Sequence, residues 1–176
     1  RRGNPDVDKT AVTGSTGVGK NNQKERGGTK KGLTLELGGK GANIVFEDAP
    51  IDQAVEGIVD GIYFNQGHVC CAGSRLLVQE SVAEEVTRKL RDRIATLRVR
   101  DPPDKNTDIG AITSKPQLEK IRRLVDFGER EAPDKFHPEC NPPAAGLWFP
   151  PPFSTTLTHS HAHPPRRILS PVLPAH

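Results

Sequence analysis

The stretch LTLELGGKGANIVFEDAPIDQAV, residues 33–55, contains the change of periodicity that decides the fold. Its leucines alternate with polar residues over 33–37, and this spacing predicts a β-strand with one buried face. The stretch NIVF at 43–46, apolar after its first residue, predicts a second strand. Apolar residues then recur over 51–62 at the spacing of an amphipathic helix. Strands that alternate with helices in this way predict an α/β fold with a mainly parallel sheet.

The chain after this stretch continues the alternation. Residues 75–79 predict another strand, and 114–127 predict a helix that starts at a serine. A further helix between them is expected to bury one apolar face, formed by Val82, Val86, Leu90, Ile94 and Leu97. For the helix starts, Asp48 can cap the first helix, and Ser81 with Glu84 can form a capping box for the second.

Three other segments differ from this pattern. The β-branched run at 10–13 predicts a buried strand that enters a turn at a glycine. Residues 21–31, NNQKERGGTKK, contain no apolar side chain, so we expect a loop there. From residue 132 onward Pro, His and Ser dominate without periodicity, which predicts a tail with little structure. We expect no metal site in this tail, although HSHAH at 159–163 spaces three histidines alternately.

Composition limits the classes of function. The net charge of +3 is too small to indicate nucleic-acid binding, and no apolar run approaches the ~18 residues of a membrane span. Three cysteines give no disulfide framework and fit a reducing compartment, so we expect a cytoplasmic protein. Hydrophobic residues make up 34% of the chain, which predicts a thin core. A basic run is expected to be a solvated helix face: Arg88, Lys89, Arg91 and Arg93.

Two Gly-rich segments contain the residue types of a nucleophilic site. LELGGK at 35–40 contains Glu36, and FNQGHVCCAGSR at 64–75 contains Cys70 and Cys71. A thiol attacks a carbonyl carbon as the thiolate, and a carboxylate at the end of a strand can act as a base in such a reaction. His68 could also lower a thiol pKa, but a surface or packing role is the stronger hypothesis.

The segment GSTGVGK at 14–20 has two interpretations. It nearly matches a P-loop, but Asn21 replaces the Ser or Thr that binds Mg²⁺, and 21–31 is not expected to form the helix that a P-loop requires. As GSTxxG it also resembles the turn on which a family of dinucleotide-binding enzymes places the cofactor's pyrophosphate, and helix N-terminal amides would serve either ligand.

Together these segments resemble the NAD(P)-dependent aldehyde dehydrogenase superfamily over about residues 5–131. The matching segments occur in the family's order: 7–20, 33–55, 61–80 and 101–121. The resemblance implies that Glu36 is the general base and that Cys70, rather than Cys71, is the nucleophile. It also implies cofactor-binding positions, which are Gly14, Ser15 and Leu37.

The reaction implied by the resemblance is the oxidation of an aldehyde to a carboxylic acid. The Cys70 thiolate adds to the aldehyde, hydride passes to NAD or NADP, and water activated by Glu36 hydrolyses the thioester. The implied fold is the family's parallel-sheet, three-layer α/β sandwich, present in part. Residues 1–37 would be the edge of the cofactor domain, 38–131 the front of the catalytic domain, and 132–176 a poorly matching tail.

Several departures from the family's pattern lead us to expect an internal fragment that is inactive alone. His68 stands where the family usually has Gln, and Gly41 where it has a Ser-like residue. Arg166 and Arg167 stand where it has two glutamates. The family's N-terminal half is expected to be missing, with its oxyanion-hole asparagine. The full-length form would be a homo-oligomer acting on a small aldehyde.

Two alternatives remain at this point. The chain could be a non-catalytic relative or remnant that keeps the fold, because 21–31 and 132–176 match the family poorly. It could also be a P-loop nucleotide-binding protein, against which Asn21 argues.

Overall fold

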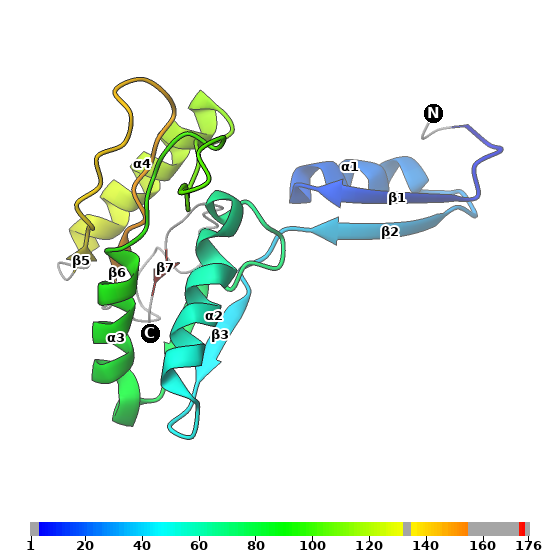
Figure 1. The fold of residues 1–176 in the computed structure, drawn as a ribbon. Coiled ribbons are helices and arrows are strands. Elements are labelled where there is room, and N and C mark those ends of the chain that lie inside the picture. The colour runs from blue at the N-terminus through cyan, green and yellow to red at the C-terminus, as the bar shows by residue number, and fades with distance from the viewer. Residues whose placement is uncertain (1–3, 132–134, 155–172, 175–176) are drawn as a thin grey trace. The chain divides into compact units, whose positions relative to one another are not determined.

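The computed structural model describes residues 4–131, 135–154 and 173–174. The chain divides into two compact units, Arg1–Gly39 and Lys40–His176. The positions of the chain's parts relative to one another are not determined (Figure 1), so the contacts within each unit define the fold.

The first unit is a parallel strand pair with one helix. β1 (Lys9–Gly14) pairs with β2 (Gly32–Leu37), and α1 (Thr16–Arg26) connects the strands and packs against both (Figure 1). Half-buried and exposed side chains alternate along the strands, so one face lies under α1 and the other is open. The predicted strand at 33–37 is confirmed, whereas the strand at 10–13 is half-buried rather than buried.

The prediction of a loop over 21–31 is wrong for its first part, because α1 continues to Arg26. The helix begins with a side-chain cap in which Ser15 Oγ accepts a hydrogen bond from Val18 N at 3.3 Å. Its last turn contains Lys24 and Arg26, whose charges favour the negative end of the helix dipole. End effects therefore stabilise a helix that has little apolar surface.

α1 packs on the strands through a close backbone approach. A Cβ at Gly19 would lie 2.8 Å from both terminal methyl groups of Leu37, so only glycine gives this spacing without a shift. Asn22 is also buried, and its Nδ2 donates to Val18 O at 2.7 Å. A glycine and a hydrogen-bonded amide thus occupy the face where an amphipathic pattern would place apolar residues.

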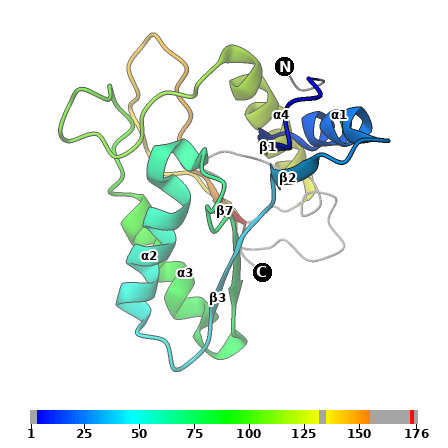
Figure 2. The same ribbon diagram turned by 90° about the vertical axis from the view of Figure 1, so that its right-hand side faces the viewer.

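The second unit contains another parallel pair, β3 (Ala42–Val45) with β4 (Arg75–Val78). α2 (Ile51–Tyr63) and the short 3₁₀ helix η1 (Phe64–Gly67) connect the two strands, and α3 (Glu80–Ile94) follows β4. α2 and α3 pack side by side against this pair (Figure 2). This order confirms the predicted α/β fold with parallel strands.

The predicted apolar faces of α2 and α3 form the main core. Seven of their side chains are buried: Val55, Ile58, Val59, Ile62, Val86, Leu90 and Ile94. Val45 and Leu76 contribute from the strands, and Leu97 follows from the chain after α3. Burial of this apolar surface is the main favourable contribution to the stability of the unit.

The predicted helix caps are wrong. α2 begins after Pro50 and α3 after Gln79, and neither start has a side-chain cap hydrogen bond. Because α3 begins at Glu80, Ser81 lies inside its first turn. The Ser81 hydroxyl instead donates to Glu47 Oε2 at 3.0 Å, which links α3 to the chain after β3.

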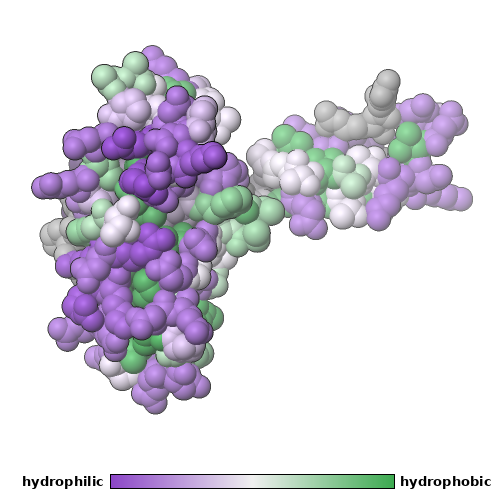
Figure 3. Space-filling view, in the orientation of Figure 1, coloured by the Kyte–Doolittle hydropathy of each residue, from purple (hydrophilic) through white to green (hydrophobic). Residues whose placement is uncertain are grey.

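Hydrophilic side chains predominate on the surface of the second unit that Figure 3 shows, and ion pairs join α2 to α3 there. Arg93 Nε donates to both carboxylate oxygens of Glu56 at 2.8 and 3.0 Å, and Lys89 bridges Asp52 and Glu85. The carboxylates of Asp52 and Glu85, as hydrogen-bond partners, raise the pKa of Lys89. Arg88, Lys89 and Arg93 thus pair with acidic residues at the surface, as predicted, whereas Arg91 is half-buried and its Nε atom is shielded from solvent.

α4 (Lys115–Glu131) forms the predicted third helix, and Ser114 Oγ accepts from Gln117 N at its start. Its buried face joins a second apolar cluster: Ile112, Leu118, Ile121, Leu124 and Val125.

The prediction of a little-structured tail is confirmed for 137–152, which contain no helix or strand, but it is wrong for three short strands. β5 (Lys135–Phe136), β6 (Phe153–Ser154) and β7 (Leu173–Pro174) form a small sheet. Phe153 is 1% exposed and belongs to the main core. Tyr63 is buried beside this segment and donates to Pro152 O at 3.4 Å, and burial raises its pKa.

Within the described parts of the chain, no helix has the length and apolar character needed to cross a membrane.

Candidate active site

The cysteine loop, residues 64–74, contains near its start three consecutive residues in the left-handed region. Asn65, Gln66 and Gly67 have φ of 49°, 56° and 70°. At this turn the chain leaves the direction of the α2 axis. Backbone hydrogen bonds then fix the residues that follow. His68 N donates to Asn65 O at 3.0 Å, and Ala72 N donates to Val69 O at 3.2 Å. The loop therefore has a defined shape after the short helix η1 as well as within it.

The far end of the cysteine loop is held by β3. Asn43 Nδ2 donates to Gly73 O at 3.0 Å. A Cβ at Gly73 would lie 2.3 Å from the same Nδ2, so the two segments approach as closely as they do because residue 73 has no side chain. Gly73 thus packs directly against β3.

Cys70 lies between these two anchored ends. Its side chain and that of Cys71 are exposed free thiols. No described residue accepts a hydrogen bond from the Cys70 backbone N–H. An available N–H next to an exposed thiol is the arrangement that can stabilise an oxyanion when the sulfur adds to a carbonyl group. Burial raises the pKa of the third thiol, Cys140, which is less exposed.

Glu36 occupies the open face of the first unit. It lies opposite Thr13 in the strand pairing, and both side chains are exposed on the face that α1 does not cover. A carboxylate in this position can contact water and act as a base.

The three predicted cofactor positions lie together in the first unit. Gly14 is opposite Leu37 at the ends of the two strands, and Ser15 begins α1. The Leu37 side chain packs against Gly19, so only its backbone is available to a ligand. The first turn of α1 contains no acidic residue, and no described residue accepts from the N–H groups of Thr16 and Gly17.

This arrangement fits an anionic ligand such as a pyrophosphate. Free amides at a helix N-terminus, at the carboxyl end of parallel strands, are the donors that such groups use. The formation of α1 also removes one argument against a P-loop, since the expected loop is a helix, whereas the argument from Asn21 is unaffected.

Glu36 and Cys70 belong to different units, so their implied roles as base and nucleophile of one site stay a prediction. Arg166, Arg167 and the histidines of 159–163 lie outside the described residues. In the described ranges no group of three His, Cys, Asp or Glu side chains could hold a metal ion.

Sequence reasoning missed two residues that shape the site. Asn43 bonds the cysteine loop from β3, and Thr113 Oγ1 lies 3.1 Å from His68 Nδ1. Asn43 is the first and only polar residue of the predicted strand 43–46, and a polar residue at that position is a usable signal. Nothing local marks Thr113.

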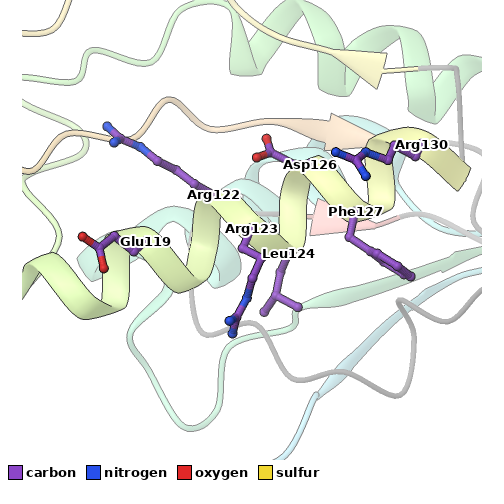
Figure 4. A pocket seen from close by; sticks show the side chains of 7 residues that line it. All are labelled: Glu119, Arg122, Arg123, Leu124, Asp126, Phe127 and Arg130. Carbon is purple, nitrogen blue, oxygen red and sulfur yellow. The ribbon is translucent and has the colours of Figure 1, made fainter.

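A surface cavity on α4 contains none of the predicted site residues. Its lining side chains all come from that helix: Glu119, Arg122, Arg123, Leu124, Asp126, Phe127 and Arg130. Arg123, Leu124 and Phe127 extend from one side of α4, and Arg122 and Asp126 from another (Figure 4). Mixed charges on one helix form no convergent set of donors or acceptors, so the cavity is a surface groove rather than the candidate site.

Comparison with known proteins assigns the arrangement to one family. The aldehyde dehydrogenase family model matches residues 2–175, which includes the tail that was expected to match poorly. The structure of an NAD-dependent aldehyde dehydrogenase from Sinorhizobium meliloti is similar, with 36% identity, a TM-score of 0.92, and coverage of 99% of this chain and 35% of that chain.

Two further structures give the same result. Betaine aldehyde dehydrogenase from Staphylococcus aureus in complex with NAD⁺ has 30% identity and a TM-score of 0.88, with 99% of this chain and 35% of that chain covered. An aldehyde dehydrogenase from Bacillus cereus has 31% identity and a TM-score of 0.89, with the same coverage of both chains. The chain thus spans 35% of the length of the structures it matches.

Proposed function

Because the chain belongs to the aldehyde dehydrogenase family, we propose that it carries the nucleophile and general base of an enzyme that oxidises an aldehyde to a carboxylic acid. Cys70 is the nucleophile and Glu36 the base. The observation that carries the proposal is Cys70 itself: an exposed thiol, beside its own unpaired backbone N–H, in a loop anchored at both ends. Because the chain covers 35% of the length of the matched structures, we propose this reaction for the full-length enzyme rather than for the 176-residue chain alone.

The reaction proceeds through sulfur. The Cys70 thiolate donates an electron pair to the aldehyde carbon, and the carbonyl oxygen becomes an oxyanion that the Cys70 N–H stabilises. Loss of hydride from that carbon leaves a thioester. Glu36 then takes a proton from water, the resulting hydroxide adds to the thioester carbon, and the C–S bond breaks. The products are a carboxylic acid and the regenerated thiolate.

The hydride acceptor is a nicotinamide dinucleotide, NAD or NADP, held in part by the first unit. The Ser15 region and the amides of Thr16 and Gly17 would bind the pyrophosphate, with Gly14 and the Leu37 backbone beside it. Support for NAD comes from the betaine aldehyde dehydrogenase structure, which is a complex with NAD⁺. When bound, the nicotinamide would accept hydride from the substrate carbon.

We further propose that residues 1–37 belong to the cofactor domain and 38–131 to the catalytic domain, with 132–176 following. The free cysteines favour a reducing compartment, and we propose the cytoplasm. The full-length enzyme would be a homo-oligomer that acts on a small aldehyde.

Selective alkylation tests the nucleophile. In the 176-residue chain treated with limiting iodoacetamide, we expect Cys70 to be labelled before Cys71, and Cys140 last because burial raises its pKa. Peptide mass spectrometry gives the three rates, and Cys70→Ser is the control that removes the fastest site. Faster labelling of Cys71 would transfer the role by one residue, and equal rates at both would support the non-catalytic alternative.

A further inference from the structure

The start of the cysteine loop is strained. Asn65 and Gln66 both adopt left-handed backbone angles, at φ 49°, ψ 41° and φ 56°, ψ 28°. A non-glycine residue in this region costs about 1–2 kcal/mol, and such residues persist only where surrounding contacts hold them. Asn is often found in this region, but Gln is not. The loop therefore requires an external contact at Gln66.

The segment 109–113 provides that contact. With the Gln66 amide assigned so that its oxygen faces a donor, Oε1 accepts from Gly110 N at 2.9 Å. Gly110 is buried, and a Cβ there would lie 2.9 Å from the same terminal amide atom of Gln66, Oε1 in this assignment, and 3.1 Å from Pro102 Cγ. The absence of a side chain at Gly110 therefore lets the Gln66 amide reach the backbone.

A second contact follows two residues later. His68 Nδ1 lies 3.1 Å from Thr113 Oγ1, which is hydrogen-bonding distance for either histidine tautomer. Gln66 and His68 on one segment thus meet Gly110 and Thr113 on the other. Both contacts fall within the residues immediately before Cys70.

The segment 109–113 is itself firmly fixed. Ile109 is 0% exposed in the main core, and Ile112 is 2% exposed in the second apolar cluster. Ile112 N also donates to Leu147 O at 2.8 Å, and Ile109 forms a bridge with Val99. A segment anchored in both clusters can hold a strained neighbour in place.

We propose that residues 109–113 form a clamp that sets the position of Cys70, with Gln66, His68 and Thr113 as positioning residues. The inference rests on the proposed function for its meaning, since it concerns the loop of the proposed nucleophile. Release of the His68–Thr113 contact lets the left-handed turn relax, and the loop then presents Cys70 and Cys71 alike.

Thr113→Val in the 176-residue chain tests the clamp, because it removes the hydroxyl with little change of shape at an exposed position. We expect amide hydrogen exchange in peptides covering 64–74 to become about 2- to 10-fold faster, the range set by loss of one hydrogen bond. The Cys70-to-Cys71 labelling ratio should fall toward unity by a similar factor, and Thr113→Ser should restore both values.

Thr107→Val is the matched control. Thr107 Oγ1 donates to Asp101 O at 2.7 Å in the same part of the chain, but this bond does not touch the cysteine loop. Exchange in 64–74 that is unchanged in Thr113→Val, or equally raised in Thr107→Val, would overturn the clamp. A wild-type labelling ratio at or below one would instead overturn the nucleophile assignment, while the exchange data would still decide the clamp.

Discussion

Replacing Gly73 with alanine is expected to destabilise the second unit, because residue 73 lies against the side chain of Asn43. The added Cβ would lie 2.3 Å from Asn43 Nδ2 and 2.6 Å from both its Cγ and Oδ1. Contacts this short must be relieved by movement. Asn43 also donates to Gly73 O, so any rotation that relieves the clash breaks that hydrogen bond.

The magnitude comes from these two effects. Overpacking of a close contact costs about 1–3 kcal/mol, and loss of the hydrogen bond about 0.5–1.5 kcal/mol. Because one movement produces both, we expect a loss of about 2–4 kcal/mol in the free energy of unfolding. That is a large part of the ~5–15 kcal/mol that stabilises a typical domain.

Urea denaturation followed by circular dichroism measures this change, and Gly57→Ala provides the matched control. Gly57 lies on the exposed side of α2, and a Cβ there meets nothing within 4 Å. Alanine in a helix interior is favoured over glycine by about 1 kcal/mol, so this variant should be more stable than the wild type. Adding Asn43→Ala to Gly73→Ala should recover the overpacking part of the loss. A Gly73→Ala variant within about 0.5 kcal/mol of wild type would refute the reasoning, since surface substitutions commonly fall in that range.

Three further outcomes are expected. The 176-residue chain mixed with aldehyde and NAD or NADP should give no measurable absorbance of reduced cofactor, because it spans 35% of the matched structures; turnover abolished by Cys70→Ala would contradict this. Leu90→Ala should cost about 2–5 kcal/mol in urea denaturation, since Leu90 is fully buried in the main core, and a loss below about 1 kcal/mol would show that the core is loosely packed. Burial raises the pKa of Asp108, but hydrogen bonds from the side chain and backbone of Arg98, with the charges of Arg98 and Arg93, outweigh it and lower the pKa. The stabilising contribution of Asp108 should therefore be present above the ordinary Asp pKa of ~3.9 and be lost as the pH falls below it. Urea denaturation at a series of pH values should show a smaller loss of unfolding free energy in this range for Asp108→Asn than for the wild type. Equal losses in the two proteins would show that the ion pair contributes nothing.

The elements that the sequence predicts well are those in which apolar residues recur at a regular spacing, because that spacing marks a buried face. The leucines of 33–37 and the apolar positions of 51–62 each report burial through local spacing, and β2 and α2 form there. α1 lacks such spacing because its docking depends on the absence of a side chain at Gly19 and on a hydrogen-bonded Asn22. A search for periodic apolar residues detects neither feature. It therefore predicts a loop over 21–26, where α1 forms.

In the candidate site, too, residues that lie in local motifs could be predicted from the sequence, whereas contacts between distant residues could not. Cys70, Glu36 and Ser15 could be selected because short motifs surround them, and the motifs resemble a family. The contact between His68 and Thr113 joins residues that are 45 positions apart, and no local pattern marks it. This contact depends on the burial of Ile109 and Ile112, which fixes the segment 109–113 beside the cysteine loop. The spacing of apolar residues in the sequence does not show which distant segments meet.

The alternation of β2 gives its last two residues different roles. Leu37 packs toward Gly19 and lies opposite Gly14, so its side chain holds α1 and only its backbone could serve the proposed cofactor role. Glu36 extends from the other face, which is open to solvent. Because successive strand residues point to opposite faces, a slip of one residue in register would bury Glu36 under α1 and expose Leu37. The leucines that fix the register for stability therefore also fix the face on which the proposed base meets water.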